Sequence, residues 1–144
     1  MQQTNSWPPR WLTSVSEKEI ANGDGPLYSQ FAEAVCRVTK DSIAAPAGEL
    51  LVLRDWQKQL LNHALARKEN GRFKHRTALI GMARKNGKSA LAASVGLAGL
   101  TLGGNGSEIY SCAADRDQAR IVFGTAKRMV ELDPELSTMF TLYK

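Results

Sequence analysis

The chain has 144 residues, of which 43% are hydrophobic and 23% are charged. This composition is typical of one globular domain and excludes collagenous, low-complexity and wholly disordered chains. The apolar stretch from Ala90 to Leu102 is too short to span a bilayer, and residues 1–10 lack the basic start and apolar run of a secretory signal. We therefore expect an intracellular, non-secreted protein with one modest hydrophobic core.

The formal net charge of +5 is unevenly distributed along the chain. Residues 1–72 carry nine Lys and Arg against eight Asp and Glu, whereas residues 73–144 carry ten against six. The densest run of cations extends from Arg67 to Lys88 and contains one acidic residue, Glu69. Such a run favours a polyanionic ligand, either nucleotide phosphates or a nucleic-acid backbone, although a solvated basic surface explains it equally well.

The first half of the chain predicts an arm followed by two helices. Residues 1–25 are rich in Pro, Ser, Asn and Gly, which predicts an irregular arm. Apolar side chains recur at helical spacing over residues 26–38, behind Pro26, and again from Asp55 until the stop signal Asn70-Gly71.

The second half predicts alternating strands and helices. The short apolar run 77–81 indicates a buried strand, and residues 90–102 indicate a buried helix. Residues 108–113 predict a second strand, and Asp115 opens an amphipathic helix that ends before Pro134. Strand, helix, strand and helix in this order predict an α/β fold, a parallel sheet with flanking helices.

Two cysteines, Cys36 and Cys112, lie in apolar stretches without partners at metal-ligand spacing. The pattern predicts two buried, reduced thiols rather than a disulfide or a zinc site.

The sharpest chemical signal is the segment from Gly81 to Ser89, Gly-Met-Ala-Arg-Lys-Asn-Gly-Lys-Ser. Backbone N–H groups at a helix start can surround an anion, and the helix dipole favours negative charge there. Gly87 would let the chain pass close to phosphates, Lys88 would reach the β- and γ-phosphates, and the Ser89 hydroxyl would ligate Mg²⁺. Met82 stands where the usual G-x-x-x-x-G-K-[ST] pattern has its first glycine, but the predicted strand before the loop and helix after it supply the expected context.

Two further features point weakly to a ligand. Gln57, beside Trp56, carries an acceptor and two donors that can read the adenine edge, although an aromatic core anchor beside a solvated Gln is the simpler explanation. Asp115 and Gln118 follow the second predicted strand, where α/β sheets bind ligands, but helix capping explains them better.

Three segments carry a family resemblance: Leu-Arg-Asp-Trp-Gln-Lys-Gln-Leu-Leu at 53–61, Ala-Arg-Lys-Asn-Gly-Lys-Ser at 83–89 and Ile-Tyr-Ser-Cys-Ala-Ala-Asp-Arg-Asp-Gln-Ala at 109–119. In this order and spacing they resemble the N-terminal part of a tailed-bacteriophage terminase large subunit. That family uses a deviant phosphate loop, in which the first glycine is often replaced and an arginine lies four residues before the lysine. Met82 and Arg84 match this deviation, and the resemblance covers about residues 50–130.

The resemblance implies the N-terminal portion only of a P-loop NTPase over residues 26–144, in an ATP-driven motor that packages viral double-stranded DNA into the procapsid. It implies that Gln57 contacts adenine, that Arg84 contacts the γ-phosphate and that Ser89 binds Mg²⁺. It also implies that Arg84 and Lys88 are the catalytic residues. The implied cofactor-binding residues are Gln57, Arg84, Lys85, Asn86, Gly87, Lys88 and Ser89.

The same resemblance implies partners and a location. The partners are viral double-stranded DNA, a portal protein, a small terminase subunit and, in the full-length protein, further copies of the chain in a ring. The location is the host cytoplasm, transiently at the procapsid portal, without a membrane.

Hydrolysis of ATP also needs an acidic residue that holds Mg²⁺ and a carboxylate that orients the attacking water. The one superficial candidate, Leu132-Asp133-Pro134-Glu135, is better explained as a helix stop because it contains proline. The family's acidic Walker B strand and nuclease cluster are absent from these residues. We therefore expect a fragment whose autonomous ATPase activity is low.

Two alternatives stay open. One is a small P-loop kinase or helicase-like ATPase, which the missing acidic strand disfavours. The other is a basic nucleic-acid or partner-binding module, with the run from Arg67 to Lys88 as its contact face and no nucleotide role. Salt-sensitive DNA binding would favour the module, and binding that requires Mg²⁺ and ATP would favour the motor.

Overall fold

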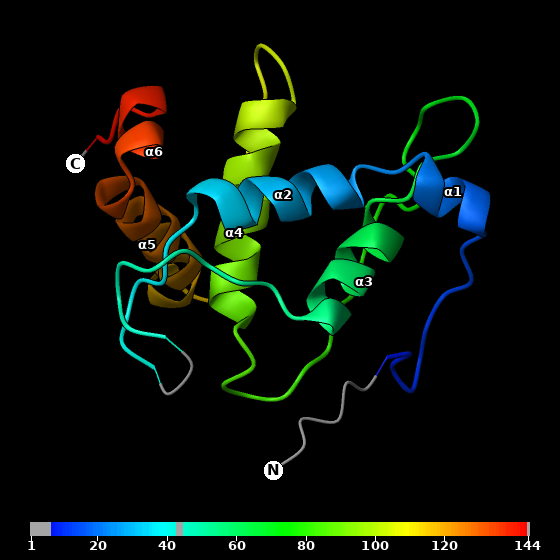
Figure 1. Ribbon diagram of the computed structural model, residues 1–144, viewed down its shortest axis with the longest axis horizontal. Helices are drawn as coiled ribbons and strands as arrows, with labels where there is room; N and C mark the ends of the chain where they lie inside the picture. The colour runs from blue at the N-terminus through cyan, green and yellow to red at the C-terminus, as the bar shows by residue number, and fades with distance from the viewer. Residues whose placement is uncertain (1–6, 43–44, 144) are drawn as a thin grey trace. The chain divides into compact units, whose positions relative to one another are not determined.

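The computed structural model describes residues 7–42 and 45–143, and Figure 1 traces them along the chain. Regular structure in these residues is helical, in the order α1 (Glu17–Ala21), α2 (Gly25–Val35), α3 (Asp55–Ala64), α4 (Lys88–Leu102), α5 (Arg116–Leu132) and α6 (Pro134–Met139).

The chain divides into two compact units, which we call unit 1 and unit 2. Unit 1 comprises Met1–Gln30 and Leu53–Gly81, and unit 2 comprises Phe31–Val52 and Met82–Lys144. The boundary falls within α2 and again just before the predicted phosphate loop. Each unit has its own internal contacts, and the loop 82–89 belongs to unit 2.

In unit 1, a capping box starts α1. The Ser16 hydroxyl accepts a hydrogen bond from the Glu19 N–H (3.2 Å), and the Glu19 carboxylate accepts one from the Ser16 N–H (3.0 Å). This reciprocal pair satisfies two N–H groups that a short helix otherwise leaves without partners. The arm predicted over residues 1–25 therefore contains a helix.

The start of α2 packs closely against α3 within unit 1. A Cβ atom added to Gly25 would lie 2.5 Å from the Cα of Asn62. Only glycine permits this approach, so Gly25 is explained by packing between the two helices rather than by helix propensity.

The chain after α3 folds back as a hairpin over residues 66–74, and together with the two residues that follow it we call this segment the hairpin 66–76. Lys68 N–H donates to Arg72 O (2.9 Å), and Lys74 N–H donates to Ala66 O (2.8 Å). Gly71 has a φ of 76°, in the left-handed region that favours glycine. The Asn70-Gly71 pair was expected to end the preceding helix, but α3 ends at Ala64 and this pair forms the hairpin turn instead.

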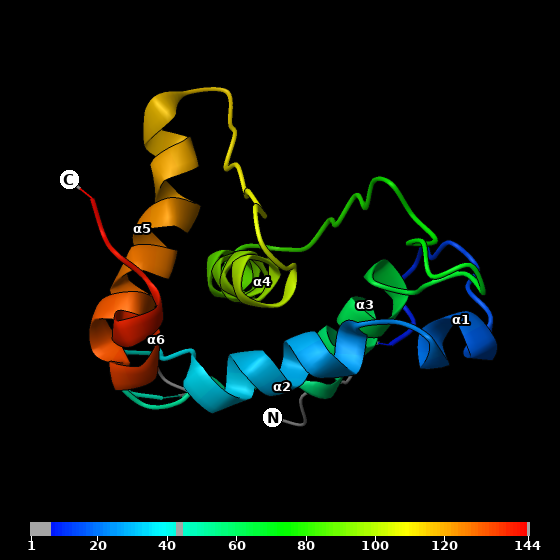
Figure 2. The same cartoon turned by 90° about the horizontal axis from the view of Figure 1, so that it is seen from above.

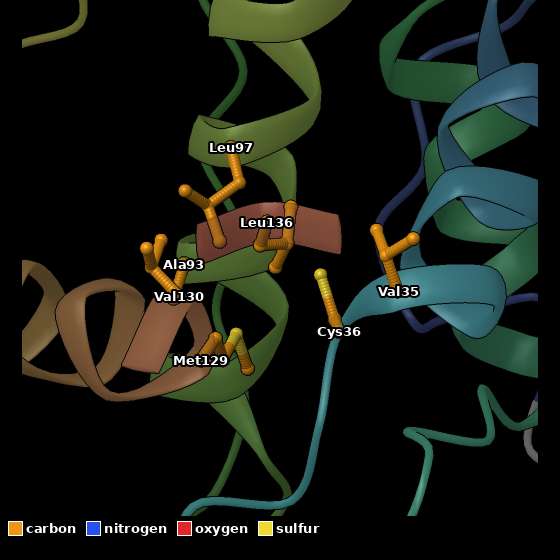
Figure 3. Packing of buried hydrophobic residues seen from close by; sticks show 7 residues of the cluster. All are labelled: Val35, Cys36, Ala93, Leu97, Met129, Val130 and Leu136. Carbon is orange, nitrogen blue, oxygen red and sulfur yellow. The ribbon is translucent and has the colours of Figure 1, made fainter. Parts of the chain in front are cut away.

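In unit 2, residues from the end of α2 and from α4, α5 and α6 form one hydrophobic cluster (Figure 3). Helix α5 packs against α4 and α6, and Figure 2 shows α4 end-on beside the long α5. Burial of apolar side chains stabilises this cluster by roughly 1.5–3 kcal/mol for each large residue. Its fully or nearly fully buried members are Val35, Cys36, Ala93, Leu97, Met129, Val130 and Leu136.

The helices expected at α2, α3, α4 and α5 are confirmed. Asp115 caps α5 by accepting from the Gln118 N–H (2.9 Å), as the capping interpretation predicts. Asp133 caps α6 by accepting from the N–H groups of Glu135 (3.0 Å) and Leu136 (3.1 Å), so the helix-stop interpretation of this segment is also confirmed.

The predicted α/β fold with a parallel sheet is wrong for the described residues. They contain no strand, only isolated antiparallel bridges from Arg37 to Leu50 and from Arg67 to Phe73. The apolar runs 77–81 and 108–113 are irregular, with Leu79 fully exposed and Tyr110 77% exposed. A strand is stable only beside a hydrogen-bonded neighbour, and local apolar pattern does not reveal whether that neighbour exists.

The prediction of two buried thiols is half correct. Cys36 is fully buried and Cys112 is exposed, and both are free. Burial, and secondarily the charge of Asp133, raises the pKa of the Cys36 thiol to about 12. Cys112 is exposed because the strand expected to bury it does not form.

No helix in the described ranges combines the length and the apolar character that crossing a membrane requires.

Candidate functional site: the loop before α4

The loop 82–89 turns tightly before it enters α4. Lys85 has a φ of 65° and Gly87 a φ of 76°, so two residues of the turn adopt left-handed backbone. Glycine adopts this conformation freely, whereas for lysine it costs about 1 kcal/mol or more. A strained non-glycine residue beside a helix start marks this turn as a place where backbone shape is constrained.

Gly87 is the N-cap of α4, and among the residues that the structure describes no side chain caps the helix. The Gly87 carbonyl accepts from the Leu91 N–H (2.9 Å), which begins the helical ladder. The N–H groups of the first turn precede that ladder and have no intrahelical acceptors. Together with the helix dipole they form a region of positive potential that is suited to an anion.

Lys88 lies folded over the loop. Its Nζ donates to the Met82 carbonyl at 2.9 Å, so the ammonium group lies beside the first residue of the turn, six residues back. Lys88 is exposed and has no carboxylate partner within the described residues. The positive charge is therefore held at the loop and is free to pair with a mobile anion.

Ser89 follows at the second helical position. Its side chain is half-buried, and in the part of the chain that the structure describes no group hydrogen-bonds its hydroxyl. A hydroxyl at this position can accept or donate, and its oxygen can ligate a hard cation such as Mg²⁺.

The remaining predicted residues of the loop are Arg84, Lys85 and Asn86. Arg84 and Lys85 are exposed, Asn86 is half-buried, and neither cation forms an ion pair within the described ranges. The loop thus concentrates three cationic side chains and uncapped backbone N–H groups within a few residues.

Helix α4 connects this loop to the hydrophobic cluster of unit 2. Leu91 is 5% exposed, and Ala93 and Leu97 belong to the hydrophobic cluster shown in Figure 3. Because α4 is packed from its first turn onward, the direction of its N-terminus is set by the core rather than by the loop.

Gln57, the predicted adenine contact, belongs to unit 1. It is 8% exposed, and its Oε1 accepts from the Arg54 N–H (2.9 Å) while its own N–H donates to the Arg54 carbonyl (2.9 Å). The side chain therefore closes the first turn of α3 with its carbonyl oxygen. The simple interpretation of Gln57 as a solvated neighbour of Trp56 is wrong, because the residue is buried.

The basic run from Arg67 to Lys88 does not form one continuous face of one unit. Residues 67–76 belong to unit 1, and Arg84, Lys85 and Lys88 belong to unit 2. The Asn-Gly pair at 70–71 is typical of a hairpin turn, and this signal could have revealed the hairpin inside the basic run. In the described ranges, no group of His, Cys, Asp and Glu side chains is arranged to hold a metal ion.

Comparison with known proteins identifies the family. The family model described as terminase large subunit, ATPase domain, matches residues 55–141. The terminase large subunit of Enterobacteria phage HK97 is 44% identical over 61 residues, which are 41% of this chain and 12% of that protein. The chain thus aligns with a small part of that relative's length. No solved structure matches the chain significantly. Because the family model covers more than half of the sequence and includes the loop 82–89, the chain belongs to the ATPase-domain family of terminase large subunits.

Proposed function

We propose that the chain binds ATP with Mg²⁺ at the loop 82–89, as the nucleotide-binding part of a motor that packages viral double-stranded DNA into a procapsid. One observation carries the proposal: the loop combines the Lys88 ammonium, the Ser89 hydroxyl and the uncapped N-terminus of α4. Membership of an ATPase-domain family supports nucleotide as the anion.

The residues fit this ligand. A triphosphate needs a convergent set of donors, which the first-turn N–H groups and Lys88 supply, and Mg²⁺ needs oxygen ligands, of which Ser89 supplies one. When bound, Mg²⁺ neutralises phosphate charge and leaves most of its coordination to water and phosphate. The absence of a capping side chain at Gly87 leaves the helix terminus open to an anion.

Each loop residue has a distinct proposed role. Lys88 exchanges its hydrogen bond with Met82 for a phosphate oxygen, and the backbone of 85–87 lines the phosphates. Arg84, which is exposed and forms no ion pair in the described ranges, contacts the γ-phosphate and stabilises the charge that develops during hydrolysis. Arg84 and Lys88 are the proposed catalytic residues.

Gln57 has a proposed role that is compatible with its capping. Its Oε1 is occupied by the Arg54 N–H, but the Nε2 amide group keeps two donors for acceptor nitrogens of adenine. Capping fixes the side chain, so little rotamer entropy is lost when it binds a base.

The partners belong to the same proposal. They are viral DNA, a portal protein, a small terminase subunit and further copies of the large subunit in a ring, with action in the host cytoplasm at the procapsid portal. Family membership supports them, since the HK97 relative is itself a terminase large subunit.

The test is a titration of a fluorescent ATP analogue, with Mg²⁺, into the chain and two variants. Lys88→Ala removes the ammonium group at the loop, and we expect its affinity to fall at least tenfold because a charge-assisted phosphate contact contributes roughly 1.5–3 kcal/mol. Lys40→Ala removes an equally exposed lysine outside the loop and should leave binding unchanged. Equal affinities for all three proteins would contradict the proposal.

A second pair of variants separates the metal from the phosphates. Ser89→Ala should weaken binding in the presence of Mg²⁺ and have little effect in excess chelator, since its hydroxyl is proposed to act through the metal. Arg84→Ala should reduce turnover more than affinity, because its proposed role is to stabilise transition-state charge. An Arg84→Ala variant with unchanged turnover in a packaging-competent protein would remove the catalytic assignment.

A further inference from the structure

The net positive charge of this chain lies mainly in unit 1 rather than in unit 2, which contains the phosphate loop. Unit 1 carries nine Lys and Arg against five Asp and Glu, a net charge of +4, whereas unit 2 carries ten against nine. Five of the nine cations of unit 1 fall within residues 67–76, with Glu69 as the single acid among them. The largest charge imbalance therefore lies in the hairpin that follows α3.

Two of these five cations hold the hairpin in place. Arg67 forms a two-point ion pair with Asp24, Nε to Oδ1 at 3.0 Å and Nη2 to Oδ2 at 2.6 Å, and its guanidinium stacks 3.9 Å from the Phe73 ring. Lys74 Nζ donates to Glu19 Oε1 at 2.6 Å. These contacts attach the two sides of the hairpin to α1 and to the turn before α2.

The other three cations, Lys68, Arg72 and Arg76, are exposed. None of them has a carboxylate within salt-bridge distance in the described part of unit 1. The one acid of the hairpin, Glu69, is paired with Lys18 instead (2.5 Å). In the described residues, Glu69, Asp24 and Glu19 thus pair with other cations, and these three positive side chains are left without a carboxylate partner.

The hairpin presents these side chains from a constrained backbone. Lys68 and Arg72 lie opposite each other, joined by the 2.9 Å hydrogen bond from Lys68 N–H, and the Asn70 side chain accepts from the Arg72 N–H (3.1 Å). Figure 1 shows this segment as the green loop beside α1. A projecting loop of this kind can approach an extended ligand. It does not offer an uncapped helix start or several donors that point at one place, which a single nucleotide would need.

We infer that the hairpin 66–76 is a contact surface for the phosphate backbone of double-stranded DNA. Lys68, Arg72 and Arg76 contact phosphates, and Arg67 and Lys74 position the loop. The inference rests on the proposed function for the identity of the polyanion, but the surface itself is separate from the nucleotide loop. Contacts of this type are independent of base sequence and release counterions, so they weaken with salt.

The test measures binding of the whole 144-residue chain to a labelled random-sequence DNA duplex, without nucleotide, over a series of salt concentrations. In Lys68→Ala/Arg72→Ala/Arg76→Ala, the apparent Kd should rise at least about tenfold at roughly 100 mM salt. The slope of log K against log salt should become shallower by about 2 to 3, since each phosphate contact contributes about 0.9.

A matched control removes the same number of charges elsewhere. Arg10, Lys40 and Arg116 are exposed and form no ion pair within the described residues. The triple alanine variant at these positions lowers the net charge by the same amount. Its Kd should stay within about twofold of the wild-type value, and its salt slope within about 0.5 of the wild-type slope. Circular dichroism establishes that both variants are folded.

The outcomes separate this inference from the proposed function. Equal losses in the hairpin and control variants would show that net charge alone matters and would overturn the inference. A wild-type chain that binds ATP but not DNA would also overturn it while leaving the nucleotide proposal intact. A chain that binds DNA through the hairpin but fails to bind ATP would support the contact surface and contradict the nucleotide proposal.

Discussion

Arg37 Nε donates to Asp133 Oδ2 at 2.9 Å, and this contact links the segment after α2 to the junction of α5 and α6 within unit 2. Asp133 is 3% exposed, and its other oxygen caps α6. The Arg37 guanidinium also donates to the Gly48 carbonyl (3.0 Å). One carboxylate therefore satisfies a helix start and a cation from a segment about 96 residues away in sequence.

Replacement of Asp133 by alanine should destabilise the chain by about 3 kcal/mol, because it removes the cap of α6 and leaves the Arg37 charge without its partner. Asp133→Asn keeps an acceptor for the cap and should have an intermediate effect. The measurement is chemical denaturation followed by circular dichroism. Arg120→Ala breaks an exposed pair on α5 (3.6 Å to Asp117) and should change stability by less than about 0.5 kcal/mol.

Gly87→Ala tests the shape of the phosphate loop. The left-handed φ of 76° at Gly87 costs an alanine about 1–2 kcal/mol, so we expect lower stability and weaker ATP binding together. Gly124→Ala is the matched control, since an added Cβ there meets no atom within 4 Å in the middle of α5. That variant should be neutral or stabilising by about 0.5–1 kcal/mol. Unimpaired ATP binding by Gly87→Ala would separate the backbone turn from nucleotide binding.

Gln57 variants separate capping from adenine recognition. Gln57→Glu keeps an oxygen that accepts from the Arg54 N–H and adds a negative charge at the start of α3, so stability should be maintained. It removes the amide donors, so affinity for ATP should fall while affinity for inorganic triphosphate stays constant. Gln57→Ala should lose both functions and should be less stable by about 1 kcal/mol. If Gln57→Glu binds ATP normally, the residue is a helix cap only.

The pH dependence of stability should reveal the contact between Lys74 and Glu19. The hydrogen bond from Lys74, followed by that from the Ser16 backbone, lowers the pKa of Glu19 from 4.5 to about 2. Between these two values the unfolded state binds more protons than the folded state, so stability falls as pH falls from about 4.5 to about 2. The slope of the unfolding free energy against pH should be smaller in Glu19→Gln over this window, and an unchanged slope would contradict the pairing.

Thiol reactivity should distinguish the two cysteines. Cys112 is exposed, whereas Cys36 is buried with its pKa raised to about 12. At pH 8, a thiol reagent should modify one group in the native chain and two in denaturant, because the thiolate is the reactive form. Native Cys112→Ser should show almost no reaction. Rapid modification of Cys36 in that variant would mean that the core of unit 2 opens.

The raised pKa of Cys36 should also make the stability of the chain fall at high pH. The folded thiol ionises near pH 12 and the unfolded thiol near 9. The stability contribution of this buried, neutral group is therefore fully present below about pH 9 and is lost as pH rises toward 12. Cys36→Ala should remove this part of the decrease in stability at alkaline pH. The variant should also be less stable by a constant amount at every pH, because packing in the cluster is lost.

Local sequence predicted α2, α3, α4 and α5, but it missed α1 and α6 and placed the end of α3 at Asn70-Gly71 rather than at Ala64. Helical periodicity and capping residues such as Asp115 depend on neighbours a few positions away, and the structure confirms them. The Gly-Lys-Ser segment together with the Trp-Gln and Asp-Arg-Asp-Gln segments was also enough to identify the family. The roles of Arg84, Lys88, Ser89 and Gln57 in ATP binding stay predictions.

Tertiary structure decided what depends on distant partners. The runs 77–81 and 108–113 have the composition of strands, but a strand needs a hydrogen-bonded neighbour, and no local pattern supplies one. Likewise, the basic run looked continuous in sequence, whereas Asp24 and Glu19 pair with Arg67 and Lys74. The three other cations of the hairpin have no acidic partner in the part of the chain that the structure describes. The amino-acid sequence determines how many cations there are. Only the fold decides which of them remain available to a ligand, because ion pairing depends on distance in space.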